Sequence, residues 1–193
     1  QYTLPTTEFF NFTTTNGTSL NGWMMKPPGF DASRKYPVIM FQYGGPGSQQ
    51  VTDRWSPGGG GGWEMYMATK GYLIVCVDGR GTGGRGAEFA KCTYLNLGVK
   101  EAEDQVETAK YLGNQTYVDK SRIGIWGWSY GGYMTIMAMS EGTPVFKAGA
   151  AVAAVTAWKY YDTIFAERFM RTTKENMEGY RACSAFTRAA KLH

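Results

Sequence analysis

The pentapeptide Gly127-Trp128-Ser129-Tyr130-Gly131 is the part of this chain best suited to chemistry, because it matches the G-x-S-x-G pattern. In that pattern a serine stands on a sharp turn between a strand and a helix, where its hydroxyl can attack a carbonyl carbon. The short apolar run Ile123–Trp126 precedes the pentapeptide, and a mostly apolar stretch, residues 130–140, follows it. The setting predicts that Ser129 is a nucleophile; the alternative is a glycine-rich turn with an incidental serine.

The two glycines of the pattern have a physical reason. A side chain at position 127 or 131 would collide with the neighbouring strand and helix, and the turn forces the serine into a strained backbone conformation. The first N–H groups of the following helix would then point toward an oxyanion as it develops. In a chain with 26 glycines the pentapeptide alone is a weak signal, so its position between strand and helix decides the interpretation.

The elements that must position this serine can be predicted from hydrophobic patterning. Four short apolar runs favour strands covered on both faces: residues 38–43, 73–77, 123–126 and 149–152. Helical patterns occupy 63–70, 99–109 and 130–140, and the middle one has acidic residues on its polar face. Residues 8–26 predict a hairpin that turns at Asn16-Gly17. Alternating strands and helices predict an α/β fold with a mostly parallel sheet flanked by helices.

Composition and charge exclude several classes of protein. The 193 residues are 43% hydrophobic and 19% charged, which excludes intrinsic disorder. The net charge of +4 is scattered rather than striped, so no nucleic-acid partner is expected. The cysteines Cys76, Cys92 and Cys183 lack the spacing of a disulfide framework or a zinc site. The five glycines 58–62 predict a loop rather than a phosphate cradle, because no apolar strand precedes them and no Lys-Ser/Thr follows.

Several segments together resemble the dipeptidyl peptidase IV branch of the prolyl oligopeptidase family of serine peptidases. Residues 127–133 (GWSYGGY) resemble its nucleophile elbow, and residues 41–49 (FQYGGPGSQ) its tyrosine-bearing loop. Residues 77–83 (VDGRGTG) are similar to the end of its next strand. Residues 158–162 (WKYYD) and 167–170 (ERFM) are similar to its pocket-lining helix. The likeness runs in the same order from about Glu8 to the last residue.

The resemblance implies an α/β-hydrolase catalytic domain and a serine exopeptidase. Such an enzyme releases dipeptides from peptides with a penultimate proline or alanine, through an acyl-enzyme on Ser129, and needs no metal or organic cofactor. By position, the hydroxyl of Tyr43 and the backbone N–H of Tyr130 would form the oxyanion hole; without the resemblance, Tyr43 reads as a buried aromatic at a strand end. Four residues would line the apolar proline pocket, with ordinary core packing as their alternative: Val155, Trp158, Tyr161 and Phe165.

The chain departs from the family pattern in its catalytic triad, whose members follow the order Ser, acid, His. The only histidine is the terminal His193, which matches a position before the next strand and is expected to be structural. Asp162 matches the pocket helix rather than the triad acid, and Asp78 and Arg80 are expected to brace a turn. Residues 1–193 are therefore interpreted as a partial catalytic domain, incomplete at its C-terminal end.

Further expectations follow from this interpretation. The β-propeller domain of the family is absent from these residues, the sheet edge after Val152 is expected to be open, and the 193 residues alone are expected to be inactive. The intact parent is expected to work outside the cytoplasm and to form a homodimer, as the resemblance implies. Two alternatives remain: another α/β-hydrolase, such as an esterase or acylaminoacyl-type peptidase, or a non-catalytic fragment.

Overall fold

The computed structural model describes residues 3–55, 62–142 and 144–192. Its strands are β1 (Thr6–Thr13), β2 (Ser19–Lys26), β3 (Tyr36–Phe41), β4 (Leu73–Asp78), β5 (Val118–Trp128) and β6 (Ala148–Val152). Its helices are α1 (Gly62–Thr69), α2 (Ala87–Lys91), α3 (Val99–Gly113), α4 (Tyr130–Met139), α5 (Thr163–Met170), α6 (Met177–Ala182) and α7 (Ala185–Arg188), with short 3-10 turns η1 (Trp158–Tyr160) and η2 (Ala189–Lys191). Of the five-glycine run, residues 58–61 lie outside the described residues, and Gly62 begins α1.

All six strands form one sheet in the order β1-β2-β4-β3-β5-β6. Strand β2 runs antiparallel to both β1 and β4, whereas β3, β4, β5 and β6 run parallel to one another. The mostly parallel sheet predicted from the four apolar runs is therefore confirmed. Because parallel strands end at the same edge, the segments that follow β3, β5 and β6 meet beyond one end of the sheet.

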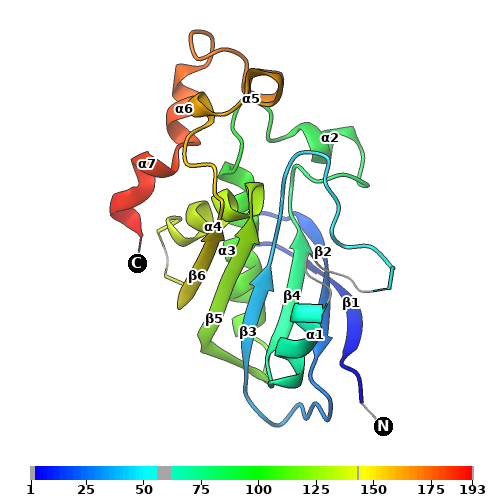
Figure 1. Ribbon diagram of the computed structural model, residues 1–193. Helices are drawn as coiled ribbons and strands as arrows, with labels where there is room; N and C mark the ends of the chain where they lie inside the picture. The colour runs from blue at the N-terminus through cyan, green and yellow to red at the C-terminus, as the bar shows by residue number, and fades with distance from the viewer. Residues whose placement is uncertain (1–2, 56–61, 143, 193) are drawn as a thin grey trace.

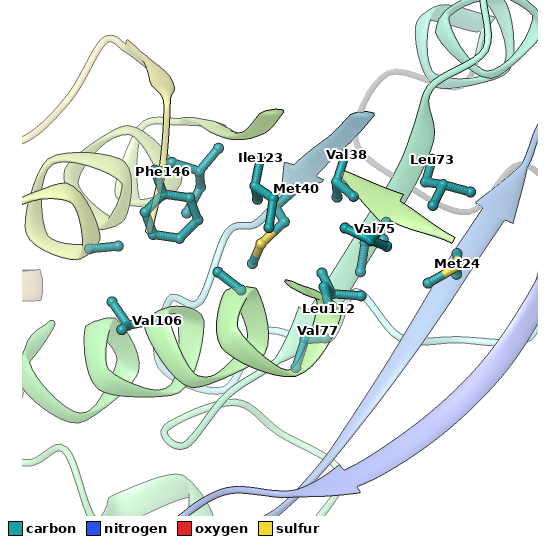
Figure 2. Close-up of a cluster of buried hydrophobic side chains, with 14 of the residues drawn as sticks. Met24, Val38, Met40, Leu73, Val75, Val77, Val106, Leu112, Ile123 and Phe146 are labelled. Carbon is teal, nitrogen blue, oxygen red and sulfur yellow. The ribbon is translucent and has the colours of Figure 1, made fainter. Parts of the chain in front are cut away.

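Helices cover both faces of the sheet (Figure 1): α3 and α4 lie on one face and α1 lies on the other. The larger core lies under α3, where Val106 and Leu112 pack against side chains of β3, β4 and β5, as Figure 2 shows. Burial of each such aliphatic side chain contributes about 1.5–3 kcal/mol to folding. The smaller core joins Trp23, Ile74 and Cys76 to α1, so Cys76 is the small buried residue that its apolar surroundings suggest.

The predicted hairpin is present as β1 and β2, paired from Thr6 with Lys26 to Thr13 with Ser19. Its turn is longer than a two-residue loop, and the backbone N–H of Thr14 donates to the carbonyl oxygen of Thr18 at 2.9 Å. Gly17 adopts a φ of 83°, the left-handed conformation for which glycine is suited.

Strand β5 begins five residues earlier than the apolar run at 123–126 indicates. Its pairing with β3 is interrupted after Val118 and resumes at Ile123, so the polar residues between them bulge out of the ladder. The carboxylate of Asp119 holds this bulge, accepting from the backbone N–H of Ser121 at 3.0 Å and from Nε of Arg122 at 2.6 Å. The polar bulge explains why periodicity missed the first part of the strand.

Strand β6 is an edge of the sheet. Within the described part of the chain it pairs only with β5, and four of its five residues are exposed. A hollow of about 410 Å³ beside it, on the α1 face, is lined almost entirely by apolar groups, among them Trp63, Trp126 and Gly149. The open edge expected after Val152 is therefore confirmed for the described residues.

The chain after β6 folds into short helices: α5 and α6 lie beyond the carboxyl ends of the parallel strands, at the top of Figure 1, and α7 lies lower, against α4. Among the residues described, no helix is long and apolar enough to cross a membrane. The three cysteines are free thiols.

Candidate active site

Ser129 stands at the corner where β5 ends and α4 begins. Its φ of 59° and ψ of −115° place it among the few non-glycine residues with positive φ. Such a conformation costs about 1–3 kcal/mol and persists only where surrounding contacts enforce it. Two backbone hydrogen bonds do so: Ser129 N–H donates to the carbonyl oxygen of Val152 at 2.9 Å, and Tyr133 N–H donates to that of Ser129 at 3.0 Å. The predicted strand–turn–helix setting is confirmed.

The glycines on either side of Ser129 are required by close backbone contacts. A Cβ on Gly127 would lie 2.5 Å from the carbonyl oxygens of Gln42 and Gly131. A Cβ on Gly131 would collide with the same oxygen of Gln42. The end of β3 thus packs directly against the turn, which leaves no room for a side chain at either position.

The tyrosine loop begins where β3 ends and lies against the turn. The side-chain amide of Gln42 donates to the carbonyl oxygen of Gly131 at 2.5 Å, and the ring of Tyr43 lies 6.1 Å, centroid to centroid, from the ring of Tyr130. Farther along, the carboxylate of Asp78 accepts the backbone N–H of Val51 at 2.8 Å, which ties the loop to the end of β4. The structure thus brings the predicted Tyr43 and Tyr130 together.

Tyr130 is the first residue of α4, so its N–H has no partner within the helix and is free in geometry to donate outward. Its side chain is only 3% exposed, and its hydroxyl donates to Oε1 of Glu101 at 2.9 Å. Burial, followed by the nearby acid Glu101, raises the pKa of the Tyr130 hydroxyl well above its ordinary value. The hydroxyl is therefore a permanent donor at physiological pH.

An aromatic cluster lies beside the turn and consists of Tyr130, Trp158, Tyr161 and Phe165. Ring centroids are 5.3 Å apart for Tyr130 and Trp158, 5.3 Å for Trp158 and Phe165, and 5.5 Å for Tyr161 and Phe165. Trp158 is almost completely buried, whereas Tyr161 is 42% exposed. Val155 packs partly buried against the same group. The structure therefore gathers all four predicted pocket residues next to Ser129's helix.

The stretch that resembles the family's pocket-lining helix is not one continuous helix. Tyr161 and Phe165 do not share a continuous helix, because Tyr161 is extended (φ −90°, ψ 168°) and α5 begins only at Thr163. The break is made by Asp162, whose carboxylate accepts the backbone N–H of Phe165 at 2.8 Å and so caps α5. The two rings still meet edge to face across the cap.

Asp162 therefore has a structural role as a helix cap, in line with its match to the pocket segment rather than to a triad acid. His193 lies outside the described residues. Arg80 binds the carboxylates of Asp104 at 2.8 Å and Glu103 at 3.0 Å, and Asp78 holds the tyrosine loop. The expectation that Asp78 and Arg80 brace turns is confirmed.

Sequence reasoning missed the buried acids of α3. Patterning puts Glu101 and Asp104 on the polar face of this helix, yet they are 1% and 0% exposed. Burial is the largest influence on Glu101 and raises its pKa to about 7, while the N–H groups of Gly98 and Glu101 and the hydroxyl of Tyr130 act in the opposite direction. No feature of the sequence alone distinguishes Glu101 from its solvated neighbours on the helix.

Comparison with known proteins gives a family match: the profile described as "Prolyl oligopeptidase family" matches residues 61–193. The probable dipeptidyl-aminopeptidase B of Arthroderma gypseum is 45% identical over 186 residues, and that of Ajellomyces dermatitidis is 48% identical over 174 residues. These alignments cover 95% and 89% of this chain but 20% and 18% of the relatives. The chain thus spans about a fifth of the length of the curated relatives it matches.

Among solved structures, the crystal structure of Porphyromonas gingivalis dipeptidyl peptidase 4 matches with a TM-score of 0.94 and 53% sequence identity. The match covers 100% of this chain and 27% of that one. These likenesses confirm the predicted α/β-hydrolase fold and the resemblance to the dipeptidyl peptidase IV branch.

Proposed function

Because this chain belongs to the prolyl oligopeptidase family, we propose that its intact parent releases dipeptides after a penultimate proline or alanine, with Ser129 as the nucleophile. The observation that supports this most is the strained backbone of Ser129 at the start of α4, beside an aromatic cluster. Relatives named dipeptidyl-aminopeptidase B, and a structure named dipeptidyl peptidase 4, support the same substrate class.

The proposed reaction is acyl transfer in two halves. Oγ of Ser129 attacks the carbonyl carbon of the substrate's second residue and gives its proton to a general base, and the C=O electron pair moves onto oxygen. The backbone N–H of Tyr130 and the hydroxyl of Tyr43 donate to that oxyanion. The C–N bond then breaks, the leaving amine takes the proton, and water hydrolyses the ester on Ser129 to free the dipeptide.

The oxyanion hole supplies much of the proposed rate enhancement. Each donor aimed at developing negative charge is worth about 3–4 kcal/mol in the transition state. The N–H of Tyr130 is left unpaired by the start of α4, and Tyr43 is held nearby by the Gln42 contact. Preorganised donors of this kind need no rearrangement as charge develops, which is why their placement matters.

The aromatic cluster is proposed to receive the side chain of the penultimate residue. Val155 and the rings of Trp158, Tyr161 and Phe165 present apolar surface that suits a proline ring, and alanine would fill it less completely. The rim position of Tyr161, which is the most exposed ring of the cluster, fits a group that contacts an entering ligand.

The general base and its acid are proposed to come from parts of the parent outside residues 1–193, since the only histidine here is His193. Without them the serine hydroxyl keeps its proton and is a weak nucleophile, so we expect no turnover by these residues alone. A homodimer and a location outside the cytoplasm are part of the same proposal, by analogy with the family.

The full-length parent and its Ser129→Ala variant should be assayed on a chromogenic Xaa-Pro substrate. Release by the parent and its loss in the variant are expected, while circular dichroism checks that the variant is folded. Equal turnover by both proteins would remove Ser129 from the mechanism. Hydrolysis of short esters without release from Xaa-Pro would instead assign the parent to another branch of the fold.

A further inference from the structure

Within residues 3–55, 62–142 and 144–192, Glu101 is the acid that hydrogen-bonds the side chain of Tyr130, the residue after Ser129. It lies in the first turn of α3, and its Oε1 accepts the hydroxyl hydrogen bond of Tyr130 at 2.9 Å. Its other oxygen, Oε2, is buried and has no hydrogen-bond partner among the described residues. A carboxyl group held in a dry site with a single side-chain bond is costly for folding, which calls for a reason beyond stability.

The titratable groups that interact electrostatically with Glu101 in the described structure are acids. Tyr130 and Tyr133 face it from α4, Asp104 from its own helix, and Cys183 from the end of α6; Cys92, which follows α2, is also within its electrostatic reach. None of these carries a positive charge, so the ionised form is favoured by hydrogen bonds from the N–H groups at the N-terminal end of α3 and from the hydroxyl of Tyr130. Glu101 therefore stabilises the position of Tyr130 without forming an ion pair.

The ring of Tyr130 lies between the proposed oxyanion hole and the proposed pocket. Its centroid lies 6.1 Å from that of Tyr43, 5.3 Å from that of Trp158 and 6.4 Å from that of Phe165. One face of the cluster therefore adjoins the oxyanion side and another adjoins the pocket side. A swing of the Tyr130 side chain about χ1 would disturb both at once, and the bond from its hydroxyl to Glu101 is a polar contact that opposes this swing.

We propose that Glu101 is a positioning residue for the proposed peptidase: its hydrogen bond fixes the Tyr130 ring and thereby sets the preference for proline over alanine in the pocket. This inference rests on the proposed function and adds a residue to it. Glu101 acts through Tyr130 and does not touch the reacting atoms. A fixed ring gives the pocket a definite floor, which matters more for a rigid proline ring than for the small alanine methyl group.

The test compares variants of the full-length parent on matched chromogenic Xaa-Pro and Xaa-Ala substrates. Glu101→Ala removes the acceptor, Tyr130→Phe removes the donor but keeps the ring, and Glu101→Gln keeps an acceptor oxygen. We expect the first two each to lower kcat/KM for Xaa-Pro about tenfold, as loss of one buried hydrogen bond would. We expect both to lower the Pro-to-Ala ratio, while Glu101→Gln stays within about twofold of the parent. The double variant, Glu101→Ala with Tyr130→Phe, should lose no more kcat/KM for Xaa-Pro than either single variant, because both changes break the same hydrogen bond.

A matched control is Glu107→Gln, which removes a carboxylate on the same helix that binds Thr15 and Lys110 and lies outside the site. A general loss of folded protein would lower the activity on both substrates equally and leave the Pro-to-Ala ratio unchanged. An unchanged Pro-to-Ala ratio in Tyr130→Phe would overturn the inference, and this result can be read even where Glu101→Ala fails to fold. Where Glu101→Ala does fold, losses that multiply in the double variant would overturn the inference as well. A parent that releases no dipeptide would instead overturn the proposed function, and this inference with it.

Discussion

The side-chain amide of Gln42 donates to the carbonyl oxygen of Gly131 at 2.5 Å and so joins the end of β3 to the first turn of α4. The two residues are 89 positions apart in sequence. This contact fixes the tyrosine loop relative to the serine, because Tyr43 follows Gln42 directly and Gly131 lies two residues after Ser129. The geometry of the proposed oxyanion hole therefore depends on one buried amide.

The first prediction replaces the amide donor of Gln42 with a carboxyl group. In Gln42→Glu the side chain places a carboxyl oxygen against the Gly131 carbonyl oxygen in a fully buried site. We expect the free energy of unfolding to fall by more than about 2 kcal/mol near neutral pH. The penalty should shrink at low pH, because a protonated carboxyl group can donate the lost hydrogen bond. Chemical denaturation at pH 5 and pH 8 measures this loss of unfolding free energy, and Gln49→Glu, at an exposed position of the loop, is the control.

The second prediction concerns the close packing at the turn. In Gly131→Ala the new methyl group meets the carbonyl oxygen of Gln42, a backbone atom that cannot move aside. We expect a loss of about 3 kcal/mol or more, outweighing the gain of at most about 1 kcal/mol that alanine brings to a helix. Gly62→Ala at the start of α1 meets no atom of the described residues within 4 Å and should change stability by less than about 0.5 kcal/mol. Equal midpoints for the two variants in thermal unfolding would contradict this packing.

The third prediction tests the cap that separates Tyr161 from α5. Asp162→Ala removes the acceptor of the Phe165 N–H and should cost about 1 kcal/mol, concentrated in the first turn of α5. Hydrogen exchange followed by mass spectrometry should show faster exchange in a peptide spanning residues 163–170. Asp162→Asn keeps a capping oxygen and serves as the control. Unchanged exchange in the alanine variant would mean that Asp162 does not hold this helix.

The fourth prediction is a pH dependence of stability. The pKa of Glu101 is raised by burial from 4.5 to about 7, so the folded state binds this proton more tightly than the unfolded chain does. The stabilisation of the folded state by protonated Glu101 is therefore fully present below pH 4.5 and is lost as the pH rises through 7, which lowers the free energy of unfolding by up to about 3 kcal/mol. Glu101→Gln removes this loss, so its stability relative to the parent should increase between pH 4.5 and pH 8.

Thermal unfolding of the parent and the variant across this pH range checks the fourth prediction, because all other titrating groups are common to both proteins. Glu107→Gln is the control: burial acts to raise the pKa of Glu107, but the hydrogen bonds from Thr15 and Lys110 together outweigh it and lower this pKa, so the variant should not gain stability as the pH rises. A constant difference between Glu101→Gln and the parent would show that Glu101 ionises as it does in water.

The parts of the fold that sequence reasoning predicted are those governed by local pattern. Apolar runs predicted β3 and β4, and the apolar stretch after Ser129 predicted α4, because burial leaves a continuous hydrophobic signal. The run at 149–152 also predicted β6, but the expectation that this strand is covered on both faces is wrong for the described residues, since four of its five residues are exposed at the sheet edge. The turn at Ser129 was predictable because a strand that turns sharply into a helix leaves no room for side chains at the positions of its two glycines.

The parts that escaped prediction depend on contacts between distant segments. Glu101 has the same pattern position as a solvated acid, but it is buried where α4 packs against α3. The break before α5 depends on the side chain of Asp162 competing with the helix for one N–H group, which spacing alone cannot reveal. The strand–turn–helix setting of Ser129 was therefore predictable from local pattern, but the Glu101–Tyr130 bond and the Asp162 cap were not.

The bond from Ser129 N–H to Val152 sets a lower limit on the length of chain that can display this serine correctly. A peptide ending before β6 would still carry the whole G-x-S-x-G pentapeptide, yet it would lack the acceptor that keeps the serine backbone at positive φ. Any engineered miniature of this catalytic centre must therefore extend at least through Val152.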